Sequence, residues 1–204
     1  MRKNPEDMKN KENQLEQLKQ VMMKKDLPLK KTAHHIVFGE GSANAPVFFI
    51  GEAPGKQEDL KGLPFVGAAG KILNQLLQSI KLNREDVYIT SILKYRPPNN
   101  RNPTIQEIVS HAPYLIKQIE IIQPQILVTL GNFSTKFVLS QFNIPQMQAI
   151  SGISQLHGQP KKIKFDHYSF VVVPMYHPAA ALYNSSLRKV LQEDFLVIKN
   201  QLQY

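Results

Sequence analysis

Short apolar runs alternate with amphipathic segments along the chain. Four runs rich in β-branched and other apolar residues predict buried strands, at residues 47–50, 87–93, 126–130 and 170–173. Apolar residues at helical spacing predict helices over 68–80, 104–122, 134–139 and 187–201. Strands that alternate with helices favour a parallel sheet between helical layers. We therefore expect one three-layer α/β domain with a central four-stranded, mainly parallel sheet.

The N-terminal segment has a helical pattern of its own. Apolar positions recur there at helical spacing, at Leu15, Leu18, Val21 and Met22. They predict an amphipathic helix over 13–25 that Pro28 ends. We accordingly divide the chain into a basic N-terminal helix, residues 1–28, and an α/β domain, residues 29–204. Within the domain, Thr104 and Glu107 have the spacing of a capping box at the start of a helix.

The ends of the predicted strands indicate where a ligand binds. In open parallel sheets, ligands bind in the crevice where loops leave the carboxyl ends of the strands. Gly51, Ser91, Gly131 and Pro174 stand at such ends. The loop 96–103, which follows the second strand, contains three prolines and cannot form regular structure.

Composition narrows the classes of partner and of chemistry. The formal net charge is +9, from 25 Lys and Arg against 16 Asp and Glu. This balance favours a polyanionic partner, with a solubilising surface as the alternative. The absence of cysteine excludes disulfides, thiolate metal sites and cysteine nucleophiles. No apolar run is long enough to span a membrane and the polar N-terminus does not resemble a signal peptide, so we expect a cytoplasmic protein without membrane contact.

Three motifs together are more specific than any one of them. GEAPGKQEDLKGLPFVGAAGKIL covers residues 51–73, KYRPPNNRNPTIQEI followed by PYLIKQIEIIQPQILVTLG forms a central block, and VVPMYHPAAAL covers 172–182. In this order they resemble the family 4, thermophile-type, uracil-DNA glycosylases over residues 29–195. The resemblance implies a monofunctional enzyme of base-excision repair that hydrolyses the N-glycosidic bond of uracil flipped out of DNA, leaving an abasic site.

The resemblance also assigns roles to the residues of a base-binding site. His177 would donate a hydrogen bond to uracil O2, and Glu52 would orient the attacking water or stabilise the cationic sugar. Ala53 stands where classical uracil glycosylases have an aspartate. Phe65 would stack on the base. The uracil-binding set is Gly51, Glu52, Ala53, Phe65, Ser91 and His177. The alternatives are a core phenylalanine at 65, a packing histidine at 177 and, for Glu52, a partner of a helix dipole or of a salt bridge.

Further residues are candidates for DNA contact. Leu182 stands where the family inserts an apolar wedge into the vacated base stack. The other candidates are Gly55, Lys94, Arg96, Arg101, Lys161 and Lys162, with Lys164 beside them. A solvated surface is the alternative for the basic residues, and we expect about half to touch DNA. Glu58 and Asp59 are expected to fix their loop. The expected partner is DNA containing uracil or another deaminated base, bound by a monomer.

Two departures from the family pattern affect these expectations. The resemblance implies four cysteines that hold an iron–sulfur cluster, but the corresponding positions are Lys24, Leu27, Tyr95 and His111. We expect neither a cluster nor another metal or cofactor, and we expect Leu27 and Tyr95 to pack as an apolar substitute.

The second departure is Ser91, which replaces a family asparagine. An asparagine amide can both accept from uracil N3–H and donate to O4, whereas serine offers one hydroxyl. We expect weaker uracil selection, slower excision or a shifted range of bases. A non-catalytic, glycosylase-like DNA-binding or replication-associated module is the alternative function. A dehydrogenase is excluded by the lack of a Gly-x-Gly-x-x-Gly motif, and covalent capture of abasic DNA is not expected without a basic insert after Ser91.

Overall fold

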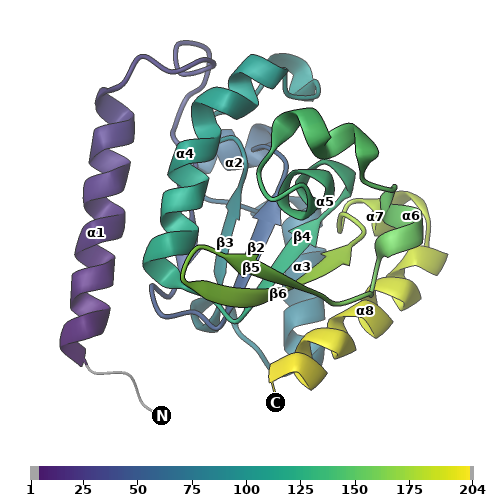
Figure 1. The fold of residues 1–204 in the computed structure, drawn as a ribbon. Coiled ribbons are helices and arrows are strands. Elements are labelled where there is room, and N and C mark those ends of the chain that lie inside the picture. Colours follow the sequence, from purple (N-terminus) through teal and green to yellow (C-terminus); the bar gives the residue numbers. More distant parts are fainter. Residues whose placement is uncertain (1–4, 203–204) are drawn as a thin grey trace.

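The computed structural model describes residues 5–202, so residues 1–4 and 203–204, the outer ends of the two predicted segments, lie outside it. One sheet, covered by helices on both faces, forms its centre (Figure 1). The strands lie in the order β1 (Glu40–Gly41), β3 (Tyr88–Ser91), β2 (Val47–Gly51), β4 (Ile126–Leu130), β6 (Tyr168–Met175) and β5 (Lys161–Phe165). The inner four strands are parallel, and β1 and β5 pair antiparallel at the edges.

The inner strands confirm the predicted mainly parallel sheet, but the predicted count of four is wrong, because the described sheet has six strands. Each of the four apolar runs forms one of the inner strands. The two missed strands lie at the edges. β1 is only two residues long, and β5 reads KKIKF with its lysines exposed, so neither forms an apolar run. Short or lysine-bearing edge strands are a common protection against edge-to-edge pairing.

Alternate residues of the inner strands supply two separate cores. Phe48 and Ile50 of β2 face one core, whereas Val47 and Phe49 face the other. Residues from α4 (Ile105–Ile122), α5 (Asn132–Leu139) and α1 (Pro5–Lys24) complete the first core. Residues from α3 (Ala68–Ser79) and α8 (Ser186–Leu202) complete the second. The sheet is therefore the middle of three layers.

Helix α1 lies along the outer side of α4 (Figure 1). It begins at Pro5, eight residues before the predicted start, because the polar stretch ahead of Asn13 gives no apolar periodicity. Leu15 and Met22 are buried in the first core, and the Lys11 ammonium donates to the Ile122 carbonyl at 3.1 Å. Within residues 5–202, no helix is long and apolar enough to cross a bilayer.

Short helices and 3₁₀ turns connect the strands to the longer helices. The remaining helices are α2 (Lys56–Lys61), α6 (Ile153–Leu156) and α7 (Ala180–Tyr183), and the 3₁₀ turns are η1 (Arg84–Asp86), η2 (Pro98–Asn100) and η3 (Ile144–Ala149). The capping box at the start of α4 is confirmed, since the Thr104 hydroxyl accepts from Glu107 N–H and the Glu107 carboxylate accepts from Thr104 N–H.

Candidate active site

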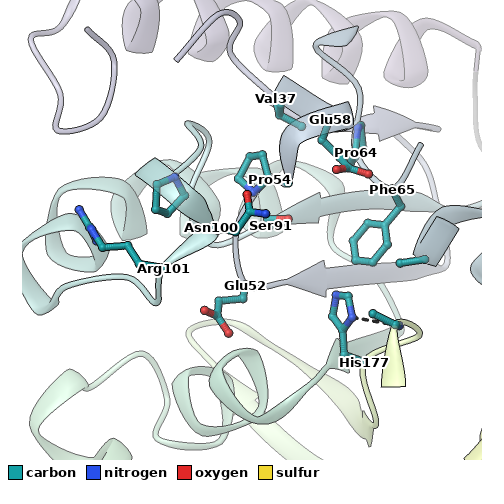
Figure 2. A pocket seen from close by; sticks show the side chains of 15 residues that line it. Val37, Glu52, Pro54, Glu58, Pro64, Phe65, Ser91, Asn100, Arg101 and His177 are labelled. Carbon is teal, nitrogen blue, oxygen red and sulfur yellow. Dashed lines mark hydrogen bonds between the residues drawn. The ribbon is translucent and has the colours of Figure 1, made fainter. Parts of the chain in front are cut away.

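A cavity of about 410 Å³ opens at the carboxyl ends of β2 and β3 (Figure 2). Its walls come from the loop after β2, the loop before α3, the end of β3, the proline-rich loop and the segment after β6. Seven of the candidate base- and DNA-binding residues line it, namely Glu52, Ala53, Gly55, Phe65, Ser91, Arg101 and His177. The strand-end rule therefore located the cavity, although these residues lie up to 125 positions apart in sequence.

Gly51 leaves room for the aromatic ring of Phe65. A Cβ at Gly51 would lie 2.8 Å from Phe65 Cζ and 3.1 Å from the Ser91 hydroxyl oxygen. Any side chain there would occupy the place of the ring or of the hydroxyl. Gly51 therefore acts by its lack of a side chain, and the Phe65 ring, with the residue only 7% exposed, reaches the cavity wall across it.

The rings of Phe65 and His177 stack at one side of the cavity, with centroids 5.5 Å apart and planes inclined by 29° (Figure 2). His177 Nδ1 accepts a hydrogen bond from Ala179 N–H at 3.2 Å. Burial lowers the pKa of His177 from 6.5 to about 4, against a smaller opposing effect of the Glu58 charge. The imidazole is therefore neutral at pH 7 and carries its proton on Nε2.

Glu52 stands in the cavity without a charged neighbour bound to it. No described residue makes a hydrogen bond or ion pair with its carboxylate, which leaves the salt-bridge alternative without support. Burial raises its pKa above 4.5. The carboxylate is available to a ligand in the cavity.

The neighbouring acids Glu58 and Asp59 hold backbone. Glu58 Oε1 accepts from Val66 N–H at 2.9 Å and from Gly67 N–H at 3.0 Å, at the start of α3. Asp59 is buried and accepts from His34 N–H at 2.8 Å, so it fixes the segment before β1. Both side chains therefore have the loop-fixing geometry expected of them.

Lys94 was expected to contact phosphate, and this prediction is wrong. Its side chain is 0% exposed, and the ammonium donates to the Thr90 hydroxyl and to the Ser91 carbonyl, both at 2.6 Å. Burial lowers its pKa well below 10.5. Lys94 follows the end of β3 and turns under the strand end into the core, beneath Ser91, instead of outward to solvent.

The other basic candidates differ in their relation to the cavity. Arg101 lines it and forms an ion pair with Glu107, with Nη1 2.9 Å from Oε2. The hydrogen bond from Arg101, against the opposing effect of burial and together with the Thr104 hydrogen bonds, lowers the pKa of Glu107 from 4.5 to about 2. Arg96 does not line the cavity, and its Nε donates to Asn100 Oδ1 at 2.7 Å. The three lysines lie on β5, away from the cavity, where Lys161 and Lys162 pair with β6 well before its carboxyl end and Lys164 pairs near its start.

Two residues that the sequence reasoning did not select stand near the site. Asn100 lines the cavity and carries an amide. Tyr183 is 90% exposed beside Leu182, which is itself 48% exposed and lies on α7 outside the cavity wall. Both could have been found from their neighbours, since Asn100 precedes Arg101 and Tyr183 follows Leu182 directly.

Comparison with known proteins assigns the family. Residues 38–200 match the family model of the uracil DNA glycosylase superfamily. The chain belongs to this superfamily. It is 46% identical over 187 residues to a type-4 uracil-DNA glycosylase of Sulfurisphaera tokodaii, covering 91% of this chain and 83% of the relative. Type-4 enzymes of Saccharolobus solfataricus, at 47% over 175 residues, and Archaeoglobus fulgidus, at 43% over 178 residues, are similar. These alignments cover 85% and 87% of this chain, and 79% and 87% of the relatives.

The residues that stand at the positions of the expected cluster cysteines do not fit a metal cluster. Lys24 is exposed, Leu27 packs against the first core and Tyr95 is buried. His111 is buried, its Nδ1 accepts from Lys94 N–H at 3.0 Å, and its Nε2 lies 3.3 Å from the Pro28 carbonyl oxygen. Both ring nitrogens are thus engaged. No group of three or more His, Asp or Glu side chains within residues 5–202 could hold a metal ion.

Proposed function

We propose that the chain is a monofunctional uracil-DNA glycosylase of base-excision repair, which hydrolyses the N-glycosidic bond of a uracil flipped out of DNA and leaves an abasic site. The observation that carries the proposal is the cavity in which the stacked Phe65 and His177 rings and the unpaired Glu52 carboxylate meet. Its volume of about 410 Å³ suits a small ligand, and a base must leave the duplex to enter it. The type-4 enzymes among the relatives support the assignment.

Phe65 and His177 act on the base. The ring of Phe65 stacks on one face of the uracil, while the small residues Ala53 and Gly55 let backbone approach its edge. His177, neutral with its proton on Nε2, donates to O2. Negative charge on O2 grows as the bond to the sugar breaks, so this hydrogen bond strengthens in the transition state, and a well-placed donor of this kind is worth ~3–4 kcal/mol.

Glu52 acts on the sugar and the water. The C1′–N1 bond breaks with its electron pair leaving on the uracil anion, and the sugar becomes cationic. The Glu52 carboxylate stabilises that charge and orients a water, whose oxygen bonds to C1′ as its proton passes to the carboxylate. Burial raises the pKa of Glu52, which makes its carboxylate a better proton acceptor than that of an exposed glutamate.

The surface around the cavity binds DNA as a monomer. Leu182 enters the vacated base stack, and the exposed Tyr183 ring beside it adds a second apolar surface to this wedge. Arg101 and Arg96 contact phosphates near the flipped nucleotide, whereas Lys161 and Lys162 reach only a more distant part of the backbone. The reaction requires no cofactor or metal.

Base selection depends on the polar groups available to the uracil edge. Ser91 presents one hydroxyl to the cavity, and Asn100 presents an amide from the proline-rich loop that follows β3. The Asn100 oxygen accepts from Arg96, so this amide is a less free partner than the asparagine that Ser91 replaces. We expect weaker discrimination between uracil and other deaminated bases than an asparagine at 91 would give.

A non-catalytic DNA-binding or replication-associated module is the second candidate, and Ser91 is the observation that favours it. A module that only binds a flipped base needs no carboxylate without a partner in its pocket. The arrangement of Glu52 and His177 therefore supports the enzyme.

An assay with oligonucleotides that contain a deaminated base distinguishes the enzyme from the non-catalytic module. The protein is incubated with single-stranded and duplex DNA containing uracil, hypoxanthine or xanthine, and abasic sites are then cleaved with alkali. If the protein is the enzyme, it releases free uracil and leaves the strand intact, and the strand is cut at the former uracil position only after alkali treatment. Retention of the oligonucleotide without release of any base would support the module.

A further inference from the structure

Arg84, in turn η1, occupies all of its hydrogen-bond donors on the segment that carries Phe65 and on two neighbouring side chains. Nη2 donates to the Pro64 carbonyl at 2.7 Å, and Nη1 donates to the Phe65 carbonyl at 3.3 Å and to Asn74 Oδ1 at 3.0 Å. Nε and Nη2 each donate to the Glu40 carboxylate at 3.1 Å. These contacts account for the five N–H groups of a guanidinium.

The Phe65 backbone needs such support. Its φ is +50°, in the left-handed region that a bulky side chain rarely adopts. Strained backbone of this kind persists only when its surroundings over-determine it. Gly70 allows the Phe65 carbonyl to approach, since a Cβ at Gly70 would lie 1.7 Å from that oxygen. Arg84 holds the carbonyls of Pro64 and Phe65, and Glu58 holds the amides of the next two residues.

We propose that the Arg84–Glu40 pair is the positioning device that keeps the Phe65 ring stacked against His177 and turned to the cavity. The pair is largely shielded, with side-chain exposures of 19% and 31%. Arg84 does not line the cavity, so it acts on a bound base through the Pro64–Phe65 segment, which does. Glu40, on the short edge strand β1, supplies the countercharge and fixes the fork of the guanidinium. The catalytic meaning of this device rests on the proposed function.

The first test is independent of catalysis. The protein contains no tryptophan, so Phe65→Trp introduces a single indole at the ring position. Adding Arg84→Lys keeps the charge but removes the planar fork. The proposal predicts a red shift of the indole emission and easier quenching by acrylamide in the double variant. An unchanged spectrum and unchanged quenching would overturn it, whether or not the protein cleaves uracil.

The second test couples Arg84 to Phe65 in the excision of uracil. Arg84→Lys is expected to lower kcat/KM about tenfold in the wild-type background, within the roughly 2- to 150-fold span of coupling between contacting residues. In the Phe65→Ala background it should change kcat/KM by less than about twofold, since the ring through which it acts is gone. Equal losses in both backgrounds would overturn the proposal. A wild type without excision would refute the proposed function and leave the fluorescence test to decide on Arg84.

Matched variants separate positioning from loss of stability. Tyr168→Phe removes the hydrogen bond from Tyr168 to the Ile119 carbonyl, 3.1 Å long, at the start of β6 and away from the cavity. It should lower stability without changing kcat/KM. Should Arg84→Lys not fold, Glu40→Gln weakens the same fork and is expected to shift the Phe65→Trp emission in the same direction by a smaller amount. No shift with Glu40→Gln would then count against the proposal.

Discussion

His111 should make the stability of the protein dependent on pH, and His111→Asn should remove that dependence. The imidazole is 0% exposed, and Nδ1 accepts from Lys94 N–H, so its proton lies on Nε2, facing the Pro28 carbonyl. Burial, with a smaller effect of the Lys94 charge and against the hydrogen bond to Pro28, lowers the pKa from 6.5 to about 4. Asn keeps an oxygen that accepts from Lys94 but does not titrate.

The direction and size of the effect follow from this pKa. Between pH 6.5 and about 4, the unfolded chain takes up a proton at residue 111 that the folded protein refuses. The contribution of His111 to the free energy of unfolding is therefore fully present above about pH 6.5 and is lost as the pH falls towards 4. A fall from 6.5 to about 4, at ~1.4 kcal/mol per pH unit, corresponds to ~3 kcal/mol. His177 has a similarly lowered pKa but is present in both proteins, so it cancels in the comparison.

Urea unfolding followed by far-UV circular dichroism at pH 7.5, 6.5, 5.5 and 4.5 measures this contribution. On acidification, the free energy of unfolding of the wild type should fall by up to ~3 kcal/mol more than that of His111→Asn. His111→Asn should be the less stable protein at pH 7.5, because its shorter side chain loses the contact with Pro28. Parallel stability profiles of the two proteins would refute the reasoning, since folding would then not lower the pKa of His111.

Three further substitutions test separate parts of the account. Tyr95→Ala should lower the free energy of unfolding by ~3–5 kcal/mol, because the buried ring packs edge-on against His111 with centroids 5.8 Å apart. Calorimetry should show a lower Tm, and an unchanged Tm would contradict the idea that apolar packing replaces the cluster. Ser91→Asn should raise the excision rate or the preference for uracil over cytosine in an oligonucleotide assay, and no change in either would contradict the role given to Ser91. Leu182→Ala should slow excision from duplex DNA more than from single strands, because only a duplex has a base stack to hold open; equal slowing on both would argue against the wedge.

The inner strands and the cavity could be predicted because both depend on local signals. Four apolar runs formed four parallel strands. The strand-end rule pointed to the cavity, which is lined by Ser91 at the end of β3 and by Glu52, the residue after β2. The edge strands β1 and β5 could not be predicted in this way, because a strand that is very short or exposed on one face has no run of apolar residues.

Long-range side-chain contacts lay beyond the sequence reasoning. Lys94 resembles a surface cation in the printed sequence, and only the packing of the chain shows that its ammonium is buried under Ser91. The sequence indicated that His111 replaces a family cysteine, but not that its ring contacts the carbonyl of Pro28, 83 residues away in sequence. Arg84 was not selected at all, because the carbonyls that it binds belong to a loop about 20 residues earlier.

Single-turnover excision by His177→Ala tests the central claim most directly. Wild type and variant are each mixed in excess with a duplex carrying one uracil, and released uracil and alkali-labile strands are measured over time near neutral pH, with binding measured in parallel. We expect excision by the wild type and a loss of ~10²–10³-fold in the variant, with DNA binding largely kept. Equal rates for the two proteins, or a wild type that binds uracil-containing DNA without releasing uracil, would contradict the account.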